Sequence, residues 1–525
     1  ASTLPPRKLA PTIYVLQDSK DEDDIEKCLI DAGLLNLAEK EKLFVIFPVA
    51  GQDGWNTRDS EDKANDLQVV SKIIEAATMW YLFPGNEKCN SYMMGMIGIN
   101  KGTEFASVFA SKHSKHLSSL LTFGGNLEKE AMDIGEDDCS MSVWAVNPKG
   151  DGYQLWMERN HLNEENTLCY GDTKEWTNRL NKAKRLLITT QAKEQTAGII
   201  SRYWYEIHSK TFRIPDTKNG KIFSMTQMMD EYNPCIYNKT KMLGDNNWHT
   251  HSWYEFVPKS ISQNSEIEKD KFPLVVALHG GGDTHEIAVA MFKWHELGEK
   301  EGFITVYANA SDDDSWNSML YSTRASDIEY LTRLIEHITD KYPVDKSRIY
   351  LSGFSNGSGM AQVLSALRPD LIAGLVAFNT RFPMHDGVYE GARKAKEKYD
   401  YRVPVFSTYG TKDAEYPPRE GSGQFSQMTF WKWYNNIEAK PLNGDDKSGA
   451  GTAGDCVVTL GEPSNGEKGE MTWHQYYSMD NPSINYYNYT VVQGLPHTVE
   501  QRLIPTAWEF IKKFSRREDG LLKID

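Results

Sequence analysis

The sequence lacks two features that would assign it to particular classes of protein. No apolar run reaches the ~18 residues that a membrane-spanning helix needs, and the mean hydropathy is −0.56. Basic residues are in deficit, with 58 Lys and Arg against 73 Asp and Glu and a net charge of −15. A general nucleic-acid binder normally presents a basic surface. We therefore expect neither a membrane nor a nucleic acid as a partner.

Cysteine is also scarce, and the six residues are widely spaced: Cys28, Cys89, Cys139, Cys169, Cys235 and Cys456. No pair has the CxxC spacing of a zinc or redox site. The residues fit two disulfides or ordinary buried thiols equally well. The chain begins at Ala1 without Met, which fits a secreted or extracytoplasmic protein whose signal peptide has been removed, and equally a trimmed chain.

The chain has 525 residues, of which 40% are hydrophobic, and this predicts about two domains with substantial cores. In the second half, short apolar runs alternate with stretches of helical spacing. This alternation predicts a doubly wound, mostly parallel sheet. Expected strands are 271–278, 303–308, 348–352, 371–378 and 403–409; expected helices are 286–300 and 326–341; aromatic segments 471–478 and 484–489 predict a strand pair before a final strand, 489–493.

The first half repeats the landmarks of the second in the same order. Residues 98–123 align with 353–378 without a gap, at a constant offset of 255. Trp55-Asn56 matches Trp316-Asn317. We interpret this order as an internal duplication, and we predict two domains, 1–205 and 206–525.

A G-x-S-x-G sequence, Gly353-Phe354-Ser355-Asn356-Gly357, stands between an apolar strand and a helix of small residues. In that context the serine lies on a tight strand-to-helix turn that its flanking glycines permit. The turn exposes the hydroxyl above the sheet, and the following helix N-terminus favours developing negative charge. Ser355 is therefore the predicted nucleophile.

A serine nucleophile needs a base and a group that orients the base. His497 follows the final expected strand, where its imidazole can take the serine proton and return it to the leaving group. His474 is the rival, but it lies inside a strand-like segment. Asp413 follows the strand 403–409 and gives the chain order Ser, acid, His; Glu415 is the fallback acid. As the base, His497 must be neutral, so activity should fall in acid.

The oxyanion of an acyl-transfer reaction needs hydrogen-bond donors. His279-Gly280-Gly281-Gly282 follows the strand expected beside the serine strand, and glycines let backbone amides approach a substrate. The predicted donors are the N–H of Asn356 and that of Gly280 or Gly281. No Lys-Ser/Thr follows these glycines, so a phosphate loop is excluded.

The second half resembles the α/β-hydrolase superfamily, and within it the polyhydroxybutyrate-depolymerase-like and feruloyl or acetylxylan esterase group. The resemblance covers roughly 250–515 and rests on PLVVALHGGG, Trp316-Asn317, YPVDKSRIYLSGFSNGSGMA and RPDLIAGLVAF. It implies ester hydrolysis through an acyl-serine, without metal or organic cofactor, and together with the internal repeat it predicts two tandem α/β-hydrolase-like domains. Ser358-Gly359 and Gly-Leu-Pro-His depart from the usual pattern and leave the substrate open.

The expected substrate is a feruloyl, cinnamoyl or acetyl ester of plant polysaccharide, or a polyester. Competing hypotheses are an α/β-hydrolase peptidase and a non-catalytic protein that binds a polymer or polysaccharide. Nothing in the sequence indicates an oligomeric state. Four residues are candidates for contact with the substrate: His279, Trp294, Trp316 and Phe354.

The first half lacks this chemistry. Asn100 stands at the serine position and Gln17 at the position of His279; Asp151 matches the acid, but no histidine matches the base. We therefore expect an inactive domain that braces the active one or shapes its cleft. A polymer-binding surface would draw on its aromatic residues, Trp55, Trp80, Tyr81 and Trp144, although core packing is the commoner role of such residues.

Overall fold

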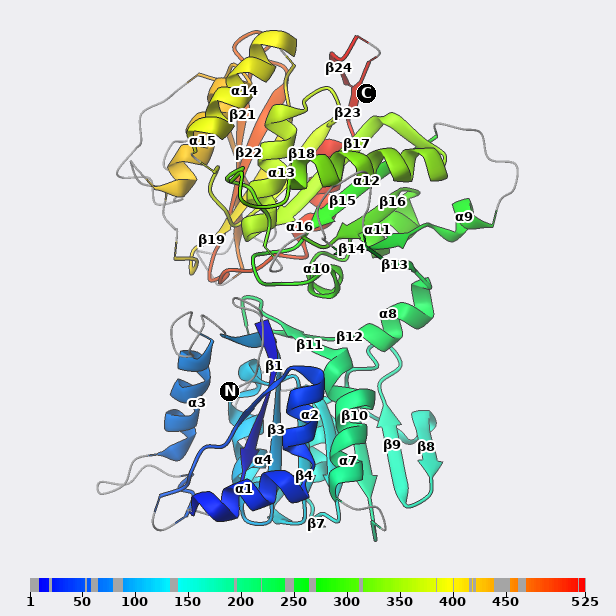
Figure 1. The fold of residues 1–525 in the computed structure, drawn as a ribbon, viewed down its shortest axis with the longest axis vertical. Helices are drawn as coiled ribbons and strands as arrows, with labels where there is room; N and C mark the ends of the chain where they lie inside the picture. The colour runs from blue at the N-terminus through cyan, green and yellow to red at the C-terminus, as the bar shows by residue number, and fades with distance from the viewer. Residues whose placement is uncertain are drawn as a thin grey trace. The chain divides into compact units, whose positions relative to one another are not determined.

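The computed structural model divides into two compact units, Ala1–Glu231 and Tyr232–Asp525, and each is described by itself (Figure 1). The structure describes residues 9–17, 21–51, 54–57, 65–78, 88–132, 140–192, 196–218, 220–240, 250–263, 271–310, 315–383, 385–399, 401–414, 418, 422–438, 454–460, 469–517 and 519–524. Trp80, Tyr81, Cys139 and Glu415 lie outside these ranges. Within them, no helix is long and apolar enough to cross a membrane.

The first unit contains an eight-stranded sheet in the order β2-β1-β3-β4-β6-β10-β9-β8. The strands from β2 to β10 are parallel, and β9 and β8 are antiparallel to their neighbours. The strands are β1 (Leu9–Leu16), β2 (Phe44–Ile46), β3 (Lys88–Ile99), β4 (Ser119–Phe123), β6 (Ser142–Val146), β8 (Thr167–Tyr170), β9 (Thr173–Thr177) and β10 (Arg185–Thr189). Two short ladders join β5 (Asn126–Leu127) to β7 (Lys149–Gly150) and β11 (Thr211–Ile214) to β12 (Lys221–Ser224).

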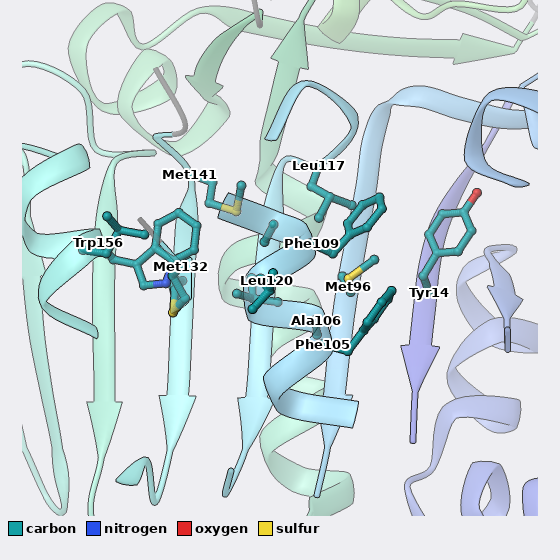
Figure 2. Packing of buried hydrophobic residues seen from close by; sticks show 14 of the residues in the cluster. Tyr14, Met96, Phe105, Ala106, Phe109, Leu117, Leu120, Met132, Met141 and Trp156 are labelled. Carbon is teal, nitrogen blue, oxygen red and sulfur yellow. The ribbon is translucent and has the colours of Figure 1, made fainter. Parts of the chain in front are cut away.

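Helices cover both faces of this sheet, so the unit has two apolar cores. Figure 2 shows the core in which Phe105 and Phe109 of α4 lie over Met96 of β3 and Leu120 of β4. The opposite core includes residues of α2 and α7. The helices are α1 (Glu22–Asp31), α2 (Leu34–Glu41), α3 (Asp66–Ala77), α4 (Gly102–Lys112), α5 (Lys129–Met132), α6 (Tyr153–Arg159), α7 (Thr196–Arg202) and α8 (Met225–Tyr232).

The first unit extends past the predicted boundary between residues 205 and 206, because the segment that follows packs against its sheet. His208 is fully buried, and its Nδ1 lies 2.8 Å from the hydroxyl of Ser119 at the start of β4. Burial lowers the pKa of His208 to about 3 and so keeps the ring neutral. Arg213 donates to the carbonyl groups of Leu117 and Ser140. These buried contacts assign residues 206–231 to the first unit.

The second unit contains a ten-stranded sheet in the order β13-β14-β16-β15-β17-β18-β19-β22-β21-β20. The strands from β16 to β22 are parallel, and the two strands at each edge are antiparallel. The strands are β13 (Cys235–Thr240), β14 (Thr250–Phe256), β15 (Phe272–Leu278), β16 (Ile304–Ala308), β17 (Val344–Phe354), β18 (Gly374–Phe378), β19 (Val405–Gly410), β20 (Cys456–Leu460), β21 (Met471–Tyr477) and β22 (Asn485–Val492); β23 (Phe514–Arg516) pairs with β24 (Leu522–Ile524).

The helices of the second unit follow its expected pattern with one break. The predicted helix 286–300 is two helices, because Lys293 adopts a left-handed φ of 57° between them. The expected segments 484–489 and 489–493 are instead one strand, β22. The helices are α9 (Lys259–Ser262), α10 (His285–Phe292), α11 (Trp294–Glu301), α12 (Asp327–Lys341), α13 (Ser355–Leu367), α14 (Asp386–Tyr399), α15 (Gly423–Tyr434) and α16 (Leu503–Ile511).

The two sheets share one connectivity. Counted along the chain from β1 and from β15, the strands of both sheets lie in the order 2-1-3-4-5-8-7-6; β13 and β14 are an addition at one edge of the second sheet. The register agrees as well, since Gly98 pairs with Thr122 as Gly353 pairs with Ala377. The predicted fold class, two α/β units with mostly parallel sheets, is confirmed. Duplication of an ancestral domain stays a prediction that this shared order supports.

Candidate active site

Ser355 lies at the junction of β17 and α13 with a φ of 50°, a left-handed backbone that is uncommon for residues other than glycine. The glycines on either side make this turn possible. A Cβ at Gly357 would lie 2.1 Å from the carbonyl oxygen of His279, and one at Gly353 would lie 2.5 Å from the carbonyl oxygen of Gly357. The close approach of α13 to the sheet therefore requires both glycines and places Ser355 at the helix N-terminus.

Asp413 and His497 meet at the carboxyl ends of β19 and β22, which are neighbours in the sheet. Nδ1 of His497 lies 2.6 Å from Oδ2 of Asp413. The Asp413 side chain is 3% exposed, whereas that of His497 is 47% exposed. A buried carboxylate in this position accepts the Nδ1–H and leaves Nε2 free to act as a base. The ring of Phe354, the residue before Ser355, lies 4.7 Å from the His497 ring between centroids.

The loops that carry this pair are joined to each other by hydrogen bonds that backbone N–H groups donate. Lys412 N–H donates to the carbonyl of Leu495 at 3.0 Å, and Gly494 N–H donates to the Thr411 hydroxyl at 2.8 Å. From the end of β18, the Asn379 amide donates to the carbonyl of Pro496 at 3.3 Å. The position of the imidazole is therefore fixed from two neighbouring strands.

The glycine loop after β15 lies against the serine turn. A Cβ at Gly281 would lie 3.3 Å from Cβ of Asn356, and one at Gly280 would lie 2.9 Å from the Phe354 ring. His279 holds the loop from below: its Nε2 accepts from Ala310 N–H at 3.0 Å, and its Nδ1 donates to the carbonyl of Gly280 at 2.7 Å. Burial lowers the pKa of His279 to about 4, so the ring is neutral, as this donor–acceptor pattern requires.

The four residues predicted to contact substrate are all buried. Trp294 has no exposed surface and packs edge-on against Phe303, which places it in the core rather than in a substrate cleft. His279 and Trp316 are each 1% exposed, and Trp316 Nε1 donates to the carbonyl of His279 at 2.9 Å. Phe354 is 2% exposed. His279, Trp316 and Phe354 therefore support the site from beneath its surface.

The rival base does not join the site. His474 lies within β21, 1% exposed, with its backbone in register with Tyr489. Two side chains of the site had no role predicted from the sequence. They are the Asn379 amide described above and the Asn356 amide, which accepts a hydrogen bond from Trp316 N–H. Repetition of Trp-Asn in both halves of the chain was the available signal for the loop around Trp316.

The first unit has a turn of the same geometry with asparagine in place of serine. Asn100 has a φ of 54°, close to the 50° of Ser355, and a Cβ at Gly102 would lie 2.1 Å from the carbonyl oxygen of Leu16. Asp151 accepts a hydrogen bond from Lys129 N–H at 2.9 Å and so caps a short helix. Two of the aromatic residues considered for polymer binding pack inside the first unit. The ring of Trp55 stacks on that of Phe105 with 4.5 Å between centroids, and Trp144 is fully buried.

Among the residues that the structure describes, no group of three or more His, Cys, Asp or Glu could hold a metal ion. The cysteines that it describes are free thiols: Cys28, Cys89, Cys169, Cys235 and Cys456.

The second unit has the α/β-hydrolase fold, with a serine on a strand-to-helix turn and an Asp–His pair after later strands of the same sheet. Residues 263–451 match the family model described as Phospholipase/Carboxylesterase. This match confirms the predicted resemblance of the C-terminal half to the α/β-hydrolase superfamily and its esterases.

Curated relatives are esterases and a depolymerase. A bifunctional acetylxylan esterase/xylanase of Neocallimastix patriciarum is 24% identical over 263 residues, covering 50% of this chain and 33% of that protein. Feruloyl esterase B of Talaromyces funiculosus is 27% identical over 131 residues, 24% of this chain and 35% of that protein. Poly(3-hydroxyalkanoate) depolymerase C of Paucimonas lemoignei is 28% identical over 158 residues, 29% and 35% respectively. The chain therefore spans about a third of the length of these relatives.

Proposed function

We propose that the protein is a serine carboxylester hydrolase whose catalytic residues are Ser355, Asp413 and His497. The observation that carries this proposal is the 2.6 Å contact between His497 Nδ1 and the buried Asp413 carboxylate. It lies at the same end of the sheet as the left-handed serine turn.

Acylation begins when Ser355 Oγ attacks the ester carbonyl carbon while His497 Nε2 takes the hydroxyl proton. The carbonyl oxygen becomes an oxyanion, and its donors are the backbone N–H of Asn356 and of Gly280 or Gly281. His497 then returns the proton to the alkoxy oxygen, the C–O bond breaks and the alcohol leaves. Asp413 keeps the imidazole oriented and stabilises its transient positive charge.

Deacylation repeats these steps with water. His497 Nε2 takes a proton from the water as its oxygen attacks the acyl-serine carbonyl, and the same amides hold the second oxyanion. Collapse of this intermediate transfers the proton to Ser355 Oγ and releases the carboxylic acid. Every proton in both steps passes through one imidazole, that of His497.

We infer that the substrate is an acetyl or feruloyl-type ester of plant polysaccharide, or a polyester. The names of the relatives, acetylxylan esterase, feruloyl esterase and poly(3-hydroxyalkanoate) depolymerase, support this substrate class. Plant polysaccharides are extracellular polymers, and this supports a secreted location. We infer further that the first unit is inactive, because Asn100 replaces the nucleophile and Asp151 caps a helix.

The test compares wild type and Ser355→Ala on 4-nitrophenyl acetate and 4-nitrophenyl butyrate. We expect wild-type turnover and a loss of roughly 10³-fold or more in kcat for the variant, because its remaining donors cannot form an acyl-enzyme. Equal rates for the two proteins would refute the proposal. Methyl ferulate, acetylated xylan and polyhydroxybutyrate, assayed in parallel, then identify the acyl group and the polymer.

A further inference from the structure

The side-chain amide of Asn356 is bonded at both ends to a single loop, residues 315–318. Its Oδ1 accepts from Trp316 N–H at 2.6 Å and from the Ser315 hydroxyl at 3.3 Å. Its Nδ2 donates to the carbonyl of Trp316 at 3.2 Å and to the Ser318 hydroxyl at 3.4 Å. The residue directly after the proposed nucleophile thus ties the serine turn to this loop.

The same loop holds the glycines that would supply the second oxyanion donor. Trp316 Nε1 donates to the carbonyl of His279 at 2.9 Å, and the indole is buried. Gly281 in turn lies against Asn356, where an added Cβ would approach the Asn356 Cβ to 3.3 Å. Asn356, Trp316 and the 279–281 loop therefore form a closed ring of contacts beside Ser355.

The loop does not need Asn356 to keep its own conformation. Asn317 N–H donates to the carboxylate of Asp327 at 2.7 Å, and the Asn317 amide donates to the carbonyl groups of Tyr321 and Ala325 at 3.0 Å and 2.9 Å. These bonds anchor the loop to the start of α12. Removal of the Asn356 amide should therefore loosen the tie to the serine turn and leave the loop folded.

The first unit provides an internal comparison. Trp55 Nε1 donates to the carbonyl of Gln17 at 3.1 Å, and Asn56 N–H donates to Asp66 at 2.7 Å, which reproduces the two anchors of the Trp316 loop. At the position of Asn356 this unit has Lys101, and lysine has no acceptor atom for an N–H of the loop. The unit without a nucleophile thus folds with the anchors and without the amide tie.

We propose that the side chain of Asn356 is a positioning residue for the oxyanion hole. It holds its own backbone N–H and those of Gly280 and Gly281 at the separation that a tetrahedral intermediate requires. This role rests on the proposed ester hydrolysis. A donor misplaced by about 1 Å can cost roughly 10² in rate, so loss of the tie should lower kcat and leave ground-state binding nearly unchanged.

The experiment measures kcat and KM on 4-nitrophenyl butyrate for Asn356→Ala and for Asn356→Leu, which keeps the bulk of the side chain. The matched control is Asn435→Ala. Asn435 is buried, and its amide also bonds both backbone groups of a single residue: it accepts from Val403 N–H at 2.9 Å and donates to the Val403 carbonyl at 2.8 Å. Inhibition by phenylboronic acid, which forms a tetrahedral adduct on a serine, reports the oxyanion hole without turnover.

Both Asn356 variants should lose about 10- to 100-fold in kcat, with KM within about threefold of wild type. Phenylboronic acid should bind more weakly by a similar factor, whereas Asn435→Ala should keep wild-type kcat and inhibition. Unchanged kcat and inhibition in the Asn356 variants, or an equal loss in Asn435→Ala, would overturn the proposal and leave the hydrolase activity standing. Equal activity of Ser355→Ala and wild type would overturn the proposed function itself.

Discussion

Gly357 and its counterpart Gly102 allow the same physical change to be made in both units. A Cβ at Gly357 would lie 2.1 Å from the carbonyl oxygen of His279, and one at Gly102 would lie 2.1 Å from that of Leu16. Both distances are more than 1 Å inside the 3.4 Å at which ordinary contact begins. The opposing atoms are backbone and cannot rotate away, so in each alanine variant the helix must move off its strand.

Overpacking of this kind costs typically 1–3 kcal/mol, and against rigid backbone we expect about 3 kcal/mol in each unit. The consequences for activity differ. Displacing α13 by about 1 Å moves Ser355 relative to Gly280 and Gly281, which should cost roughly 10² in kcat. Displacing α4 in the first unit moves Asn100, which has no proposed role in the reaction, so Gly102→Ala should keep wild-type kcat.

The assay pairs turnover of 4-nitrophenyl butyrate with hydrogen exchange measured by mass spectrometry on peptides from α4 and from α13. Each alanine variant should lose protection in its own helix, and only Gly357→Ala should lose activity. The reasoning fails if Gly357→Ala turns over within threefold of wild type. It also fails if Gly102→Ala loses as much activity while the peptides of α13 keep their protection.

Two further outcomes follow from the contacts of titratable groups. Asp413→Asn keeps the shape of the site but removes the charge that orients His497, so kcat should fall by about 10⁴, equivalent to about 5.4 kcal/mol; a loss below tenfold in stopped-flow or steady-state turnover would contradict this role. Burial lowers the pKa of His208 and His295 to about 3 in the folded protein, whereas in the unfolded chain the pKa of histidine is ~6.5. Between these two values, only the unfolded chain binds a proton at each imidazole. As the pH is lowered from 6.5 to 3, the free energy of unfolding should therefore decrease by about 1.4 kcal/mol per pH unit for each residue. His208→Phe and His295→Phe should each remove that part of the pH dependence, as measured by urea unfolding from pH 6.5 to 5. An unchanged pH dependence in these variants would refute the reasoning.

The parallel sheet was predictable because buried strands carry continuous apolar runs. The segment Phe272–Leu278 is apolar along its length and lies in the middle of the second sheet. The offset of 255 between residues 98–123 and 353–378 agrees with the register of the two sheets, in which Gly98 pairs with Thr122 and Gly353 with Ala377. The fold was therefore predictable from the local hydrophobic pattern and from the spacing of the repeat.

The remaining features depend on contacts that no local pattern encodes. Helical spacing continues through Lys293, but its left-handed backbone divides the expected helix in two. Aromatic character made Trp294 one candidate for contact with the substrate, with core packing as the alternative, and the fold buries it completely. Asn356 and Trp316 are far apart in the sequence, and so are Asn379 and Pro496. The hydrogen bonds between them form only because the sheet brings their loops together, so no sequence pattern predicts them.

The repeated turn separates what the motif G-x-S-x-G owes to folding from what it owes to chemistry. Gly98 and Gly102 are retained in a unit whose central residue is Asn100, and the backbone there is still left-handed. The flanking glycines are therefore explained by the close packing of a helix on a parallel sheet, with or without a reaction. Asparagine is among the non-glycine residues that adopt this left-handed backbone most readily, so the turn at Asn100 is less strained than the turn at Ser355. For serine, the left-handed backbone costs about 1–3 kcal/mol. A strained backbone of this kind persists when the surrounding structure holds it in place, and it is typical of functional sites. Within the motif, only the identity of the central residue therefore indicates whether a reaction takes place.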